Sequence, residues 1–148
     1  MAFTVTNKGS NFAYGATNTI SAFTPTANKL LVLSVFRQNT VAISSVTGHG
    51  TWVFVRDINA GNRIQSIYAL ITSGSPSSSS IVVSWSGANS LTETSVSEID
   101  GSDVTSVANA IPQSGVMSAY NGGAATNIVN LSAFASATNL ALIKGSGS

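Results

Sequence analysis

The chain has 148 residues, a formal net charge of +1 and only 7% charged residues. This length fits one domain with one hydrophobic core, and six scattered bases exclude the basic stripe that nucleic-acid binding requires. The absence of cysteine excludes disulfides and thiolate metal sites, and no run of about 18 apolar residues predicts a membrane span. We therefore expect neither nucleic acid nor a membrane as partner.

The surface that this composition predicts is solvated by hydroxyl and amide groups rather than by charges. Such a surface is unusual for a free cytosolic protein and is more natural for a subunit packed into an assembly. The first residues, Met1–Lys8, lack the basic and apolar regions of a signal peptide. We expect one domain over residues 1–144, followed by a Gly-Ser tail over 145–148 that resembles a flexible linker.

Hydrophobic periodicity predicts strands along the chain. Residues 30–36 are nearly all apolar and branched, which is typical of a strand covered on both faces. Residues 51–58 and 64–71, joined by a turn at 60–62, are expected to form a hairpin. Strict alternation in its first strand places two sets of residues on opposite faces: Trp52, Phe54 and Arg56 on one, and Val53, Val55 and Asp57 on the other.

The second half of the chain predicts shorter strands. After a serine-rich loop at 73–80, two separate strands are expected at 81–85 and 92–99, then a long polar excursion over 101–125, and finally strands at 127–131 and 139–143. No segment of about 12 residues has a helical apolar face with caps. The predicted fold is all-β, an antiparallel jelly-roll-like or immunoglobulin-like sandwich of about eight strands.

One internal similarity relates the two ends of the chain. Residues 20–32 align without a gap to residues 131–143, with Ser, Ala, Phe, Asn and Leu recurring in register. Both copies predict a strand end, a polar turn at the Asn and a re-entering buried strand, although a chance match of common residues is the alternative. The second copy stops after its opening strand, so we expect an open sheet edge.

Catalytic chemistry finds little support in the sequence. His49 is the only histidine, it lies between two glycines in an expected loop, and no Gly-x-Ser-x-Gly elbow is present. Glu93 and Glu98 are five residues apart, which places them on opposite faces of a regular strand and disfavours a paired general acid and base. We expect no enzyme activity and no cofactor.

The acidic residues of the chain are concentrated in one stretch. Glu98, Asp100 and Asp103 form a weak calcium candidate, but Asp100–Asp103 is also a common turn sequence that needs no metal. Five bases lie in the first 63 residues and four acids in 93–103. Identical subunits could pair head to tail across this asymmetry, or the segregation reflects chance.

Five aromatic residues could form a platform on which sugars stack: Tyr14, Trp52, Tyr68, Trp85 and Tyr120. Trp52 and Trp85 lie within apolar strands, where core packing is the simpler interpretation. Tyr120, followed by Asn121 in the polar excursion, is the better candidate for an exposed contact, with a glycan as a possible ligand.

Several motifs in order resemble a β-sandwich domain of tailed-phage virion proteins and bacterial surface proteins. They cover about residues 18–143 and consist of turn glycines and strand hydrophobes, in the segments Lys29–Leu33, Val46–Trp52, Ile67–Leu70, Ile81–Gly87 and Ser95–Gly101. In that family the second half of the domain has an Asn-x-Leu strand and continues past it into another Gly-x-Gly-x-Thr hairpin. It is absent here, which implies missing strands or strands supplied by a neighbouring subunit. The resemblance carries over no catalytic residue.

The resemblance implies a capsid-decoration, tail or fibre protein. We therefore expect a virion structural protein that forms a homo-oligomer, for example a trimer, and contacts other virion proteins. The expected location is the virion, assembled in the host cytoplasm, or the extracellular space. Two alternatives stay open: a carbohydrate-binding adhesin or lectin module, and a fibre subunit linked by donor strands.

Overall fold

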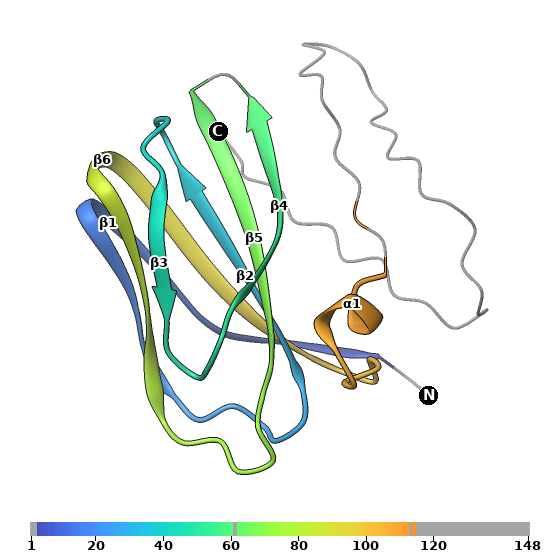
Figure 1. The fold of residues 1–148 in the computed structure, drawn as a ribbon. Coiled ribbons are helices and arrows are strands. Elements are labelled where there is room, and N and C mark those ends of the chain that lie inside the picture. The colour runs from blue at the N-terminus through green and yellow to red at the C-terminus, as the bar shows by residue number, and fades with distance from the viewer. Residues whose placement is uncertain (1–2, 61, 113, 115–148) are drawn as a thin grey trace.

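Six strands and one short helix make up the part of the chain that the computed structural model describes, which is residues 3–60, 62–112 and 114 (Figure 1). In chain order the elements are β1 (Thr4–Phe23), β2 (Leu30–Arg37), β3 (Ile43–Thr47), β4 (Val53–Ala60), β5 (Arg63–Ile71), β6 (Ser79–Asp100) and α1 (Val107–Ala110). The prediction of an all-β antiparallel fold is confirmed. The jelly-roll-like sandwich of about eight strands stays a prediction, because the predicted strands at 127–131 and 139–143 lie outside the described residues.

All six strands belong to one antiparallel sheet in the order β1-β6-β2-β5-β4, with β3 paired to β6. The two parts of the 22-residue β6 lie between different pairs of strands. Its C-terminal part, 92–100, lies between β1 and β2, whereas its N-terminal part, 81–85, lies between β1 and β3. Because β1 stays paired to β6 along both parts, the sheet curls and places β3 over β2 and β5 (Figure 1).

The inner face of the curled sheet holds the main hydrophobic core. Alternate residues of β2 meet alternate residues of the N-terminal part of β6, joined by residues of β1 and β5. Full burial of each aliphatic side chain contributes about 1.5–3 kcal/mol, so this cluster dominates the stability of the fold. The buried members are Ile20, Leu31, Leu33, Val35, Leu70, Ile81, Val83, Trp85 and Val96.

A second, smaller core covers the outer face of β2. Leu30, Val32 and Ala69 are buried there, with Val107 and Ala110 of α1 packed against them. Strand β2 is therefore covered on both faces, as its continuous apolar sequence predicts.

The first copy of the internal similarity has the predicted conformation. Strand β1 ends at Phe23, Asn28 adopts a left-handed backbone with φ of 53°, and β2 begins at Leu30. Asparagine tolerates this conformation better than most residues, which explains its place in the turn. The second copy lies outside the described residues.

Three features of the sheet differ from the sequence-based expectation. The two strands predicted at 81–85 and 92–99 are parts of the single strand β6. Strand β3 was not predicted, and β1 was predicted only at its C-terminal end, because β1 is largely polar and buries only Asn18 and Ile20. Hydrophobic alternation carries little signal in a strand whose side chains mostly face solvent.

The loop between β3 and β4 is a tight turn of three residues with positive φ: Gly48, His49 and Gly50. The carbonyl oxygen of Gly48 accepts a hydrogen bond of 2.8 Å from the Trp52 indole. A β-carbon at Gly48 would lie 2.1 Å from the backbone oxygen of Ser80, so the loop is pressed against the start of β6.

Gly48→Ala is expected to destabilise the protein strongly, because it adds this collision to the strain of a positive φ. Gly15→Ala is the matched control, since Gly15 has the same φ of 104° with no atom within 4 Å of its would-be β-carbon. The control should lose about 1–2 kcal/mol of unfolding free energy, and Gly48→Ala about 1–3 kcal/mol more. Urea unfolding measures both; equal losses would show that the loop can move away from β6.

Candidate binding and assembly surfaces

A β-bulge in β4 decides which of its side chains share a face. Phe54 pairs with Tyr68 and Asp57 pairs with Ser66, with the register shifting between Phe54 and Arg56. Because Tyr68 and Ser66 are two residues apart on β5, Phe54 and Asp57 lie on the same face of the sheet. The prediction from strict alternation, which placed them on opposite faces, is wrong for this reason.

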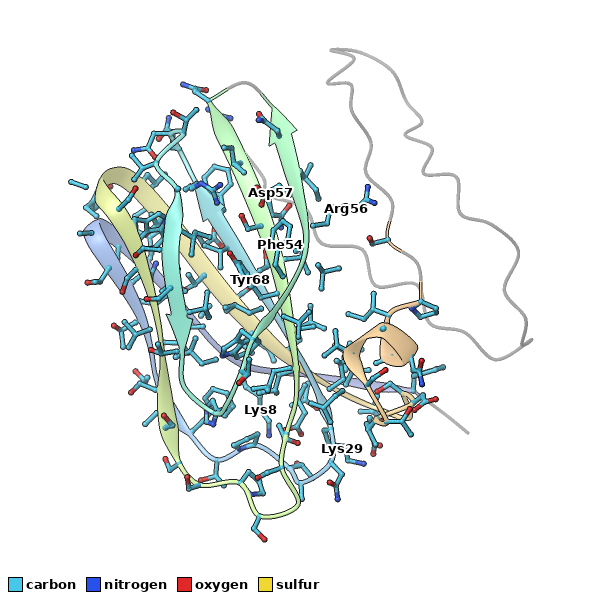
Figure 2. The ribbon with its side chains drawn as sticks, in the orientation of Figure 1. Lys8, Lys29, Phe54, Arg56, Asp57 and Tyr68 are labelled. Carbon is cyan, nitrogen blue, oxygen red and sulfur yellow. The ribbon has the colours of Figure 1, made fainter. Side chains whose placement is uncertain are left out.

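Phe54 and Tyr68 form an exposed aromatic pair on this face (Figure 2). Their ring centroids are 5.5 Å apart with the planes at 66°, an edge-to-face arrangement. Phe54 is 52% exposed, whereas Tyr68 packs partly against the inner core. The Tyr68 contact therefore orients a phenyl ring that remains half open to solvent.

Asp57 is held beside this aromatic pair by a buried arginine. The Arg37 side chain is only 6% exposed, and its Nη2 lies 3.7 Å from Asp57 Oδ2, while the Asp57 side chain is 43% exposed. Arg37 Nη1 donates a 2.6 Å hydrogen bond to the Ser66 hydroxyl, which donates in turn to Asp57 Oδ1. A buried guanidinium requires such a partner, so Asp57 is fixed in place by the need to neutralise Arg37.

We call Phe54, Asp57 and Tyr68 the hairpin site. The pKa of the Tyr68 phenol is raised, first by burial and then by the negative charge of Asp57, with Arg37 offsetting part of the effect. Tyr68 is therefore a neutral hydroxyl at physiological pH. The hairpin site offers one aromatic face, one anchored carboxylate and one phenol, a set suited to binding a ligand.

Arg56 lies on the opposite face of β4 from the hairpin site. Its partner on β5 is Ile67, and its Nε donates a 3.0 Å hydrogen bond to the hydroxyl of Ser114.

A second surface is the outer edge of β1. Among the described residues, this 20-residue strand pairs only with β6, so its other side presents unpaired backbone groups. Phe12 is 55% exposed and Tyr14 70% exposed, and their rings meet edge to face at 5.6 Å. Val5 is exposed on the same strand. We call the unpaired side of β1, with Phe12 and Tyr14, the β1 edge.

The structure assigns separate partners to the three carboxylates of the calcium candidate. Glu98 accepts hydrogen bonds from the backbone N–H and hydroxyl of Thr26, Asp100 pairs with Lys29, and Asp103 accepts from Thr105. Within residues 3–60, 62–112 and 114, no three acidic or histidine side chains come together in a way that could hold a metal ion. The Asp100–Asp103 segment forms the turn that its sequence predicts, with Gly101 at a φ of 88°.

Part of the charge asymmetry along the sequence is neutralised within the fold. Lys8 of β1 lies 3.3 Å from Glu98 of β6, and Lys29 contacts Asp100. Because β1 and β2 flank β6, two of the five early bases form ion pairs with two of the four late acids within one chain. Head-to-tail pairing of subunits through the remaining charges stays a prediction.

Among the described residues, the other candidates from the sequence, His49, Trp52 and Trp85, belong to neither surface. The centroids of the His49 and Phe23 rings are 4.4 Å apart. Burial lowers the pKa of His49, and the backbone of Ser79 and Ser77 offsets part of that shift. Neither ring nitrogen of His49 has a hydrogen-bond partner of normal geometry. Trp85 is buried in the inner core and Trp52 packs against it, as predicted. Tyr120 and Asn121 lie outside the described residues.

None of the helices in the described part of the chain is long and apolar enough to span a membrane. No known protein family matches the chain, and no curated protein or solved structure is detectably similar to it.

From the sequence, Tyr14 and Tyr68 are candidates for sugar stacking, whereas Phe12 and the shared face of Phe54 and Asp57 were missed. Phe54 and Asp57 were assigned to opposite faces because a bulge leaves no signal in an alternating pattern. Phe12 and Tyr14 stand in a polar segment, and two aromatic residues at a spacing of two among polar neighbours were the available sign of an exposed strand face.

Glu98→Gln is expected to reduce stability at neutral pH and to flatten its acid dependence. Burial raises the pKa of Glu98, but the hydrogen bonds from Thr26 and the Lys8 ammonium outweigh burial and hold it below its ordinary value of 4.5. A lowered folded-state pKa gives stability that is present above pH 4.5 and lost as the pH falls through the folded-state value.

The expected loss for Glu98→Gln at pH 7 is about 1–2 kcal/mol of unfolding free energy. Urea unfolding across pH 3 to pH 7 measures it, and the difference between variant and parent should shrink towards about pH 3. Glu93→Gln, the same change at an exposed side chain of β6, is the control. An equal pH profile for Glu98→Gln and the parent protein would contradict the assignment.

Proposed function

We propose that this chain is a structural subunit of a virion, a capsid-decoration, tail or fibre component that acts by assembling with copies of itself and with other virion proteins. The observation that carries the proposal is the β1 edge, a long strand edge with exposed aromatic residues and little charge. The resemblance to phage virion domains supplies the biological setting.

An unpaired strand edge favours strand addition unless the chain protects it. Monomeric proteins usually protect edges with charged side chains, prolines or bulges. Strand β1 has one charged residue, Lys8, and Glu98 within the same chain neutralises it. Bulges interrupt the pairing near Gly9 and Gly15, but the register with β6 is continuous over 9–13 and over 17–20. A neighbouring strand can therefore pair along either stretch.

The distribution of charge also favours assembly. Six of the eleven Asp, Glu, Lys and Arg side chains take part in ion pairs within the described residues. A surface with so few free charges provides little electrostatic repulsion between copies. Contact at the β1 edge would bury Phe12 and Tyr14, and aromatic residues are enriched at the centres of protein interfaces.

The double variant Phe12→Ser with Tyr14→Ser is expected to weaken self-association. Sedimentation velocity over a range of protein concentrations should show an oligomer for the parent protein and a shift of at least tenfold in the midpoint concentration for the variant, since truncating a central aromatic residue costs more than about 1 kcal/mol. Phe54→Ser, a matched change of an exposed aromatic residue on β4, should leave the midpoint unchanged.

Two results would overturn the proposal. One is a parent protein that stays monomeric at all concentrations and shows no affinity for capsid or tail proteins in a pull-down from purified particles. The other is an unchanged assembly midpoint in the double variant, which would remove the β1 edge as the contact.

A further inference from the structure

The hairpin site has a chemistry that assembly through the β1 edge does not use. We propose that it binds the ring of a neutral hexopyranose, either a free sugar or one residue of a polysaccharide. The inference is independent of the proposed assembly function, because its residues belong to β4 and β5, on the opposite margin of the sheet from β1.

Phe54 provides the apolar face for such a ligand. It is 52% exposed although it stands in a strand, and Tyr68 contacts it edge to face at 5.5 Å. A sugar ring has one face of C–H groups that packs against an aromatic ring and a rim of hydroxyls that requires hydrogen bonds. Because Tyr68 already orients the phenyl ring, little ordering is needed when a ligand stacks on it.

Asp57 provides the polar anchor on the same face. Arg37 and Ser66 hold the Asp57 carboxylate in place. The Asp57 side chain is still 43% exposed, so its carboxylate can accept further hydrogen bonds. Hydrogen bonds to a charged group are stronger than those between neutral groups. Ligand hydroxyls can therefore donate to a carboxylate that is already in position.

The spacing of the two groups suits one sugar ring. The partners of Phe54 and Asp57 on β5, Tyr68 and Ser66, are two residues apart, which corresponds to about 6.8 Å along an antiparallel strand. This separation allows a ring stacked on Phe54 to present an equatorial hydroxyl to Asp57. The bulge in β4 creates the arrangement, and bulges commonly re-aim side chains beside functional sites.

Two other ligand classes fit less well. A cation would be drawn to an aromatic ring beside a carboxylate. Here, however, Arg37 neutralises Asp57, and its guanidinium would repel a positively charged ligand. An apolar peptide would cover Phe54 but would also bury Asp57 without supplying a donor, which costs free energy. A neutral ligand with hydroxyl groups satisfies both residues.

A titration of the ¹⁵N-labelled full chain followed by NMR tests the inference. The probes are the methyl glycosides of glucose, galactose, mannose and N-acetylglucosamine at millimolar concentration, soluble homopolymers of the same sugars, and choline chloride. We expect saturable shifts of the amides around Phe54, Asp57 and Tyr68 with at least one sugar. Shifts with a polymer but not with its glycoside would identify a polysaccharide as the ligand, and the reverse would identify a free sugar.

Variants at Phe54 separate stacking from a structural effect. Phe54→Ala is expected to weaken sugar binding about tenfold or more, corresponding to about 1.4 kcal/mol, whereas Phe54→Tyr keeps the aromatic face and should restore it. Val53→Ala, a change at an exposed apolar residue on the opposite face of β4, should bind sugar like the parent protein. The amide spectrum of each variant reports directly whether it is folded.

The inference is overturned if none of the sugars or polymers shifts these amides, if choline alone does so, or if Phe54→Ala binds as tightly as the parent protein. None of these outcomes depends on the midpoint concentration of assembly, which sedimentation velocity measures separately. Failure of this inference and failure of the proposed assembly function are therefore distinguishable.

Discussion

The rest of the structure depends on one constraint, which is that β1 pairs with both the N-terminal and the C-terminal part of β6. Since both strands continue through the curl, one sheet provides both walls of its own core, and Ile81 and Val83 come to lie opposite Leu31 and Leu33. A buried polar cluster stabilises the bend: Asn18, only 1% exposed, donates to the backbone and hydroxyl of Thr92 and accepts from Asn11 and Thr94. Each of these polar groups is satisfied, which makes the bend a specific conformation rather than a loose collapse.

This arrangement explains why so few charges suffice. With β6 between β1 and β2, the carboxylates of Glu98 and Asp100 meet the ammonium groups of Lys8 and Lys29. The surface is then solvated largely by Ser, Thr and Asn side chains. Among the described residues, the aromatic pairs with an exposed ring are Phe12 with Tyr14 on β1 and Phe54 on β4 with Tyr68 on β5. In the strand order of the sheet these two pairs lie at opposite margins, one on β1 and the other on β4 and β5.

The local sequence pattern was sufficient to predict an element wherever burial determines which of its residues are apolar. The continuous apolar run of β2, the β4–β5 hairpin and the glycine-flanked His49 turn all follow from hydrophobicity and turn chemistry. The local pattern failed to predict strands that are mainly solvated, such as β1, or short, such as β3. It also failed at residues 86–91, where polar residues that resemble a turn continue β6. In each failure the conformation is set by pairing with a distant strand, which no local window contains.

The amino-acid sequence by itself determined the all-β class, the two-sided burial of β2 and the scarcity of charge, because composition and period-two or continuous hydrophobicity follow directly from which faces are buried. Only the tertiary structure decided which charges meet, which strand edge has no partner among the described residues and which side chains share a face. Asp57 shows the reason most clearly: one extra residue in β4 moves it beside Phe54, and a bulge arises from the register of two strands rather than from the residue types of one.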